Sequence, residues 1–284
     1  MTRRYRLRHE TAYAYSAPVF LEPQRLRFRL RSAAYLTVEA YALEIAPAPE
    51  GRRVSRDAEN NVGELAWFSG PHEGLVLTAE TVLSTSGYNP LGFVVEPAAF
   101  QRVPFDYPPT ERALLAASLA PIVVSTALRD YAAAVLANAA HDTVGFLLGL
   151  AARVHADHRV VYRETGAPMV PDETFARGAG SCRDLSWMLI AVLRDLGIAA
   201  RFTSGYFYFE QEGGGDAYDL HAWVEAFVPG AGWLGLDPSH GIATGNAHFP
   251  ICSSAVPART MTVSGGIWGE ATATLRTHVA IVPL

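Results

Sequence analysis

Cys182, His221 and Asp237 are three side chains whose types together fit catalysis by a nucleophilic thiol. Cys182 follows Gly-Ala-Gly-Ser, and an apolar pattern with helical spacing begins at the cysteine itself. A helix N-terminus stabilises an anion, and the thiolate is the nucleophilic form of cysteine. An imidazole can take the thiol proton, and a carboxylate can fix the tautomer of that imidazole. The alternative role for a lone cysteine is that of a small buried hydrophobic residue.

The segment from His221 to Asp237 is predicted to form a hairpin, with the histidine at the start of one strand and the aspartate near the end of the next. If Val228 lies opposite Gly232, Asp237 opposes Trp223, which shares a sheet face with His221. A loop with an even number of residues would place the histidine and the aspartate on opposite faces. A functional pair therefore requires a three- or five-residue loop, or a bulge.

The helix that begins near Cys182 is predicted from an apolar stripe and ends before Gly197, a natural residue for a helix C-terminus. Gly178 and Gly180 remove side chains just before the cysteine, which would let a substrate backbone approach it. Asp184 falls in the first turn, where a carboxylate offsets the helix dipole and could pair with Arg183 or Arg201. The stripe consists of Leu185, Met188, Leu189, Val192 and Leu196.

Other polar residues offer weaker alternatives. His240 lies close to Asp237 in sequence and could replace His221 as the base, but it follows a Pro-Ser turn. His155 and His158 have a spacing that metals tolerate, without a third ligand, so we expect neither a metal nor a cofactor. Cys252 has no helix start or base nearby and is expected to be structural. The backbone N–H of Cys182 is the first expected oxyanion donor, and the region around Tyr162 is the expected source of a second.

The elements around these residues fall into two regions. From residue 4 to about 96, apolar residues alternate with polar ones, which predicts an antiparallel β module. A stretch rich in proline breaks this pattern, and helical spacing begins at Glu111, with Ser125 and Asp142 as expected N-caps. Strand patterns return after the Cys182 helix. The sequence therefore predicts an α+β chain with a domain at residues 1–108 and a second at residues 109–284.

Two charged segments suggest interactions. Residues 25–31, "RLRFRLR", alternate strictly, which predicts a strand with Leu26, Phe28 and Leu30 on one face and Arg25, Arg27, Arg29 and Arg31 on the other. That arginine face could bind an anion or pair with acidic neighbours. The segment "EQEGGGDAYD" before His221 carries Glu210, Glu212, Asp216 and Asp219, and a mobile acidic loop there would attract a primary amine or a basic peptide.

Composition excludes several classes. Half of the 284 residues are hydrophobic and 18% are charged, which is typical of a globular protein and not of a disordered one. The net charge of −5 gives no indication of nucleic-acid binding. Two cysteines cannot form a disulfide framework, and no apolar run is long enough to span a bilayer. We therefore expect a cytoplasmic protein without a membrane-inserted segment; the oligomeric state cannot be predicted.

Three stretches carry a resemblance to a known family. "GAGSCRDLSWMLIAVLRDLGIAARFTSGY" and "DLHAWVEAFVPGAGWLGLDPSHG" resemble the bacterial transglutaminase-like family, with its G-x-C-x-D, H-A-W-V-E and D-P-[ST] motifs. "YRLRHETAYAYSAPVFLEPQRLRFRLR" resembles the β-rich N-terminal domain fused to that core. The resemblance implies a papain-like core of helices packed on an antiparallel sheet, with Cys182 as nucleophile, His221 as general base and acid, and Asp237 as the orienting carboxylate.

The function that the resemblance implies is acyl transfer from a peptide or a glutamine side chain, through a Cys182 thioester, to water or a primary amine. The expected partners are a peptide or protein substrate and an amine acceptor. Two alternatives stay open at this point. One is a papain-like protease or amidase without transamidation, and the other is a non-catalytic binding module on the same fold.

Overall fold

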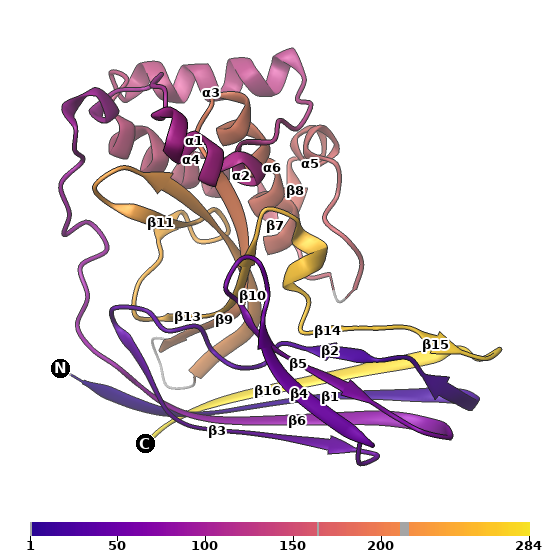
Figure 1. Cartoon of the computed structure of the whole chain (residues 1–284). Helices are drawn as coiled ribbons and strands as arrows, with labels where there is room; N and C mark the ends of the chain where they lie inside the picture. The colour runs from indigo at the N-terminus through magenta and orange to yellow at the C-terminus, as the bar shows by residue number, and fades with distance from the viewer. Residues whose placement is uncertain (1, 164, 211–215) are drawn as a thin grey trace.

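The computed structural model of the chain describes residues 2–163, 165–210 and 216–284. Its α+β architecture has helices gathered at one end and long antiparallel strands at the other, as expected from the sequence (Figure 1). A further antiparallel sheet runs between the two ends, and both chain termini lie at the strand-rich end. The described residues contain no helix that is long and apolar enough to cross a membrane.

The strand-rich end consists of two antiparallel sheets packed on one another. Their strands are β1 (Arg3–Leu21), β2 (Gln24–Leu26), β3 (Leu36–Ala46), β4 (Gly51–Arg56), β5 (Val62–Trp67), β6 (Pro71–Thr85), β14 (Val263–Ser264), β15 (Ile267–Trp268) and β16 (Ala273–Pro283). One sheet has the order β15-β1-β6-β3, with β16 also on β1, and the other has the order β14-β2-β5-β4. Alternate residues of β6 are buried, so the period-two pattern seen in the sequence places one face of this strand in the core.

The helices follow a proline-rich segment that contains a short 3-10 turn, η1 (Ala98–Gln101). The Ser125 hydroxyl accepts the Leu128 N–H, and the Asp142 carboxylate accepts the Gly145 N–H, which confirms both expected N-caps. The helices are α1 (Pro109–Leu114), α2 (Ala116–Leu119), α3 (Thr126–Asn138), α4 (Thr143–Asp157), α5 (Pro171–Arg177) and α6 (Cys182–Asp195), with a second 3-10 turn, η2 (Pro257–Thr260).

The connecting sheet has the order β12-β11-β10-β9-β13. Its strands are β9 (Ala200–Glu210), β10 (Asp216–Val228), β11 (Gly232–Asp237), β12 (Ile242–Ala243) and β13 (His248–Ser254). Ala222, Val224 and Ala226 of β10 pack in one apolar core with the stripe of α6, so this helix lies against the sheet. A separate parallel pair joins β7 (Arg159–Val160) to β8 (Ala179–Gly180), just before α6.

The last strand of the chain returns to the first. β16 pairs antiparallel with β1 from Tyr5 opposite Pro283 to Tyr15 opposite Ala273. The sequence division at residue 108 places this strand with the second region, whereas its hydrogen bonds lie in the sheet of the first. That division stays a prediction, and the pairing ties the two ends of the chain together.

The arginine-rich segment differs from its expected form. β2 ends at Leu26, and residues 27–30 are not in a strand, although Leu26, Phe28 and Leu30 are buried as expected. Arg27 is buried as well, because it donates to the Met261 carbonyl across the sheet edge. The prediction that residues 25–31 form one strand with all four arginines on its other face is therefore wrong.

The two regions share a core and polar contacts. Tyr206 and Tyr208 of β9 pack with Tyr5 and Leu7 of β1 in one buried cluster. The Asn61 side chain exchanges two hydrogen bonds with the Ser253 backbone, at 2.8 and 2.9 Å. These contacts hold the connecting sheet against the strand-rich end.

Candidate active site

Cys182 is the first residue of α6, as the sequence predicts, and its side chain is half-buried. The preceding Ser181 donates both its N–H and its hydroxyl to the Asp184 carboxylate, at 2.8 and 2.7 Å. This arrangement fixes the start of the helix beneath the thiol. The helix ends before Gly197, whose φ of 76° is favourable for glycine.

Asp184 is fully buried, and its partners differ from those expected. Its Oδ1 accepts the Met169 N–H and an Arg163 N–H, both at 2.8 Å. Asp184 therefore pairs with Arg163 and not with Arg183 or Arg201, the partners predicted from the sequence. Since Arg183 also donates to the carbonyl of Arg163, both Arg163 and Met169 are tied to the first turn of α6.

The two glycines before Cys182 have structural roles. Gly178 has a φ of 56° and ends α5, a conformation that glycine adopts without strain. A Cβ on Gly180 would lie 2.9 Å from the Asp184 Cβ and 3.1 Å from a Thr174 methyl carbon. Close packing therefore explains Gly180, and no substrate approach is needed to account for it.

The hairpin that carries His221 and Asp237 has the predicted register. Val228 lies opposite Gly232, so three residues form the loop, and Val224 lies opposite Leu236. The His221 Nε2 and the Asp237 Oδ2 are 2.8 Å apart, and both side chains are buried. The structure thus brings together the two residues whose pairing depended on an odd loop.

The Cys182 side chain also interacts with His221. Burial opposes protonation of His221, but the charge and hydrogen bond of Asp237, together with smaller contributions of both kinds from Cys182, raise its pKa to about 10. Because Nε2 faces Asp237, Nδ1 is the nitrogen left for Cys182.

Asp237 contacts two further imidazoles, that of His240, the alternative base, and that of His248, which the sequence analysis did not single out. His240 Nδ1 lies 2.8 Å and His248 Nε2 lies 3.1 Å from the same Oδ2 atom. The Gly245 N–H donates to Nδ1 of His248, so the proton of that ring is on Nε2 and is donated to Asp237. Burial lowers the pKa of His248, which keeps this ring neutral.

The two candidate bases differ in their contacts. His221 is the histidine that interacts with both Cys182 and Asp237, whereas His240 contacts Asp237 and stacks near Phe207, with ring centroids 4.4 Å apart. The ligand atoms of His221, Asp237 and His240 lie within 4.8 Å of one another and could hold a cation. Their hydrogen bonds to the shared carboxylate already account for this spacing.

The remaining candidates lie elsewhere. His155 bonds through Nδ1 to the Ser239 carbonyl, and His158 is buried and bonds through Nδ1 to the carbonyl of Val154. Tyr162 is 80% exposed, and its role as oxyanion donor stays a prediction. The acidic segment lies partly outside the described residues, since 211–215 are not described.

We expect the two cysteines to differ strongly in reactivity. Cys252 is fully buried, and burial raises the pKa of its thiol to about 12, so little thiolate forms at neutral pH. Cys182 is half-buried at a helix start. Brief treatment of the folded protein with iodoacetamide should give one adduct in the intact mass, and Cys182→Ala should remove it. Equal labelling of both cysteines in the folded protein would contradict this expectation.

Comparisons with known proteins identify the family of the chain. The model of the bacterial transglutaminase-like N-terminal region matches residues 5–84, and that of the transglutaminase-like superfamily matches residues 129–238. An uncharacterised protein of Mycobacterium tuberculosis (strain H37Rv) is 30% identical over 251 residues, which cover 84% of this chain and 79% of that protein. A protein-glutamine gamma-glutamyltransferase of Pseudomonas aeruginosa is 38% identical over 84 residues, or 28% of this chain and 13% of that protein.

The fold has a counterpart among solved structures. A Cytophaga hutchinsonii protein, described as a candidate cysteine protease, superposes with a TM-score of 0.70 at 17% identity, covering 100% of this chain and 91% of that one. The fold and the matches thus define a two-part protein with a transglutaminase-like core and a β-rich N-terminal region. The chain belongs to the transglutaminase-like superfamily.

Proposed function

We propose that this protein is a cysteine-dependent acyltransferase that acts on amide substrates, either peptide bonds or glutamine side chains. The observation that carries the proposal is the series Cys182, His221 and Asp237, with His221 in contact with both of the other side chains. A thiol, an imidazole and a carboxylate in this order form the arrangement used for nucleophilic acyl transfer.

In the first half of the reaction, the Cys182 thiolate attacks the amide carbonyl carbon. The tetrahedral oxyanion is stabilised by the backbone N–H of Cys182 at the start of α6. His221 then gives its proton to the leaving nitrogen, so the C–N bond breaks and a thioester and an amine or ammonia remain. Asp237 keeps the imidazole oriented and balances its charge.

In the second half, water or a primary amine attacks the thioester carbonyl. The neutral His221 takes a proton from this acceptor, the C–S bond breaks, and Cys182 leaves as the thiolate beside the protonated imidazole. Water yields an acid, and an amine yields a new amide. The acceptor therefore determines whether the protein acts as a hydrolase or as a transamidating enzyme.

A single set of incubations tests the proposal. The protein is incubated with a glutamine-containing peptide, with and without a primary amine, and the products are followed by mass spectrometry. We expect deamidated peptide without the amine and an amide adduct with it. Cys182→Ala should give neither product, and Cys252→Ala, the matched cysteine variant, should retain both.

Two other results would contradict the proposal, and each would indicate a different function. If only cleaved peptide bonds appear and the amine is never incorporated, the protein is a papain-like protease. If no acyl-enzyme and no product form with any amide substrate, the fold serves as a binding module. Cytoplasmic location stays part of the proposal.

A further inference from the structure

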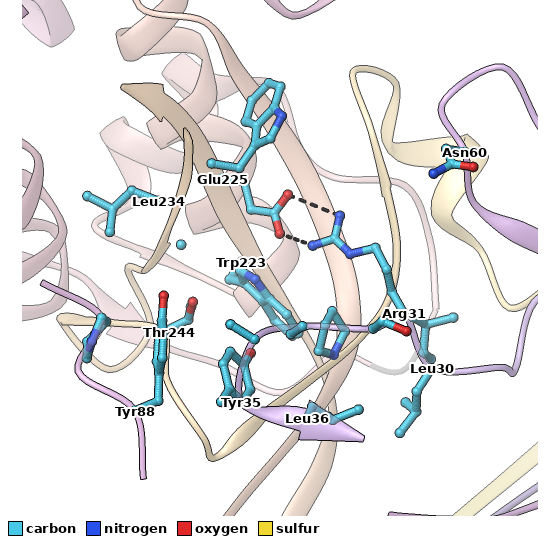
Figure 2. Close-up of a pocket in the computed structure, with 18 of the residues that line it drawn as sticks. Leu30, Arg31, Tyr35, Leu36, Asn60, Tyr88, Trp223, Glu225, Leu234 and Thr244 are labelled. Carbon is cyan, nitrogen blue, oxygen red and sulfur yellow. Dashed lines mark hydrogen bonds and ion pairs between the residues drawn. The ribbon is translucent and has the colours of Figure 1, made fainter. Parts of the chain in front are cut away.

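A large cavity lies between the strand-rich end and the connecting sheet (Figure 2). Its volume is about 1270 Å³. Neither Cys182, His221 nor Asp237 lies in its lining, so this space is distinct from the candidate active site. Its walls come from residues 29–38, from parts of residues 56–62 and 88–93, and from residues of β9, β10, β11 and β13.

The Trp223 side chain lies between the cavity and the candidate active site. Trp223 lines the cavity, and its ring lies 6.2 Å from that of His221 and 5.2 Å from that of His248, measured between ring centroids. Figure 2 shows this indole in the middle of the cavity wall, between the residues of the two regions. An occupant of the cavity would therefore lie against the indole of Trp223, which is also next to His221.

The charge of the lining is positive. Four arginines and two glutamates line the cavity, namely Arg29, Arg31, Arg56, Arg201, Glu59 and Glu225. Glu225 bonds to both Arg31 and Arg201, so this buried cluster has one more positive than negative group. Arg29 and Arg56 are exposed and have no carboxylate partner within ion-pair distance in the described part of the chain. Such a lining favours an occupant with carboxylates, which match guanidinium groups in pairs of hydrogen bonds.

The lining also has an acceptor without a donor. The buried Oε2 of Glu59 has no hydrogen-bond partner, because Nε of Arg259, with which it forms an ion pair, is 3.8 Å away. Its other oxygen accepts the N–H of Ala255 at 2.9 Å. A buried polar atom without a partner is costly, so a ligand that brings an N–H donor would gain from it. A polypeptide supplies both carboxylates and backbone N–H groups, whereas a phosphate ion lacks such N–H donors.

Aromatic side chains complete the lining. Tyr35 and Tyr88 have ring centroids 4.9 Å apart on one wall, and Trp223 and Trp233 lie on the other. The guanidinium of Arg201 lies over the Trp233 ring, 3.8 Å from its centroid. The cavity is larger than the roughly 300–1,000 Å³ usual for small-molecule sites, and its mixed lining suits a chain segment with apolar and acidic side chains.

We propose that this cavity binds an acidic segment of a polypeptide, with its carboxylates at Arg29 and Arg56, a backbone N–H at Glu59 and its apolar side chains against the aromatic wall. The site differs from the one that would carry acyl transfer, and it gives the strand-rich end a binding role. Binding there does not depend on turnover at Cys182.

Fluorescence anisotropy tests the proposal with the Cys182→Ala variant, which cannot process a peptide. The probe is a fluorescein-labelled peptide of alternating glutamate and leucine, and the matched peptides carry serine or arginine in place of glutamate. We expect only the acidic peptide to bind. The double variant Arg29→Gln and Arg56→Gln should raise its Kd about tenfold, since each exposed charge pair contributes modestly.

The matched control is the double variant Arg25→Gln and Arg53→Gln, which removes the same charge from two exposed arginines outside the cavity lining. It should leave the Kd within about twofold, and thermal unfolding should show that both double variants are folded. Equal binding of the serine peptide, or an equal loss in the two double variants, would overturn the proposal. Displacement by inorganic phosphate as effective as that by the unlabelled peptide would assign a general anion site instead. Loss of amide turnover in the wild type would leave this result unaffected.

Discussion

Replacing His221 by alanine is expected to lower kcat on an amide substrate by about 10³-fold, the usual contribution of a positioned general acid and base. His221 interacts with both Cys182 and Asp237, and burial excludes bulk water as a substitute for the imidazole. Steady-state kinetics with a glutamine peptide measures the loss. The substrate KM should change little, because the imidazole acts mainly on bond breaking.

Two further variants make this prediction specific. Asp237→Asn should retain more activity than His221→Ala, because an asparagine of the same shape can still be held by the Ser239 N–H, which donates to Oδ1 at 2.9 Å. His278→Ala, at an exposed histidine on β16, should leave kcat unchanged. If His240→Ala lowers kcat as much as His221→Ala does, the base has been assigned to the wrong residue.

The local features of the site could be predicted from the sequence because each depends on neighbours in the chain. A helix start at Cys182 follows from capping and apolar spacing, and the register of the β10–β11 hairpin follows from its loop length. The α+β class follows from the spacing of apolar residues, which alternate in the first region and recur every three or four residues in the helical part of the second. The helix start was confirmed, and the apolar stripe of this helix packs against β10 in one core.

Features that depend on which distant segments meet could not be predicted. An alternating pattern identifies β16 as a strand but not its partner, and the pairing with β1 is fixed by the fold. Likewise, the ion pair of Arg163 with Asp184 joins residues 21 positions apart, and no local pattern indicates it. His248 belongs to β13 and reaches Asp237 across the sheet, so no spacing in the sequence indicated it.

The alternating pattern of residues 25–31 predicted a strand that in fact ends at Leu26, for a related reason. Alternation predicts faces only where a partner strand continues, and β2 pairs with β5 no further than Leu26 opposite Glu64. Beyond that point the chain leaves the sheet and runs toward β13. There Arg31 meets Glu225, so the acidic neighbour expected for this segment lies on the strand of His221.

Glu225→Gln is expected to lower the free energy of unfolding by about 3 kcal/mol, because removing one member of a buried ion cluster leaves the other charges uncompensated. The Glu225 carboxylate is buried between Arg31 and Arg201, whose side chains are 28% and 17% exposed. Burial opposes its ionisation, yet the two guanidinium groups lower its pKa below the ordinary value of 4.5. Its contribution is therefore present above that value and is lost as the pH falls through the lower pKa of the folded state.

Urea denaturation at pH 7 and at acidic pH measures both parts of this prediction. The wild type should be more stable than Glu225→Gln at pH 7, and the difference should shrink as the pH falls below 4.5. Glu39→Gln is the matched control, since Glu39 bonds one arginine, Arg4, through both oxygens and lies at the surface, whereas Glu225 is buried between two arginines. Its unfolding midpoint should hardly change, because exposed ion pairs are screened by water and salt. Equal destabilisation by the two variants would mean that the Arg31–Glu225–Arg201 cluster does not hold the strand-rich end to β10.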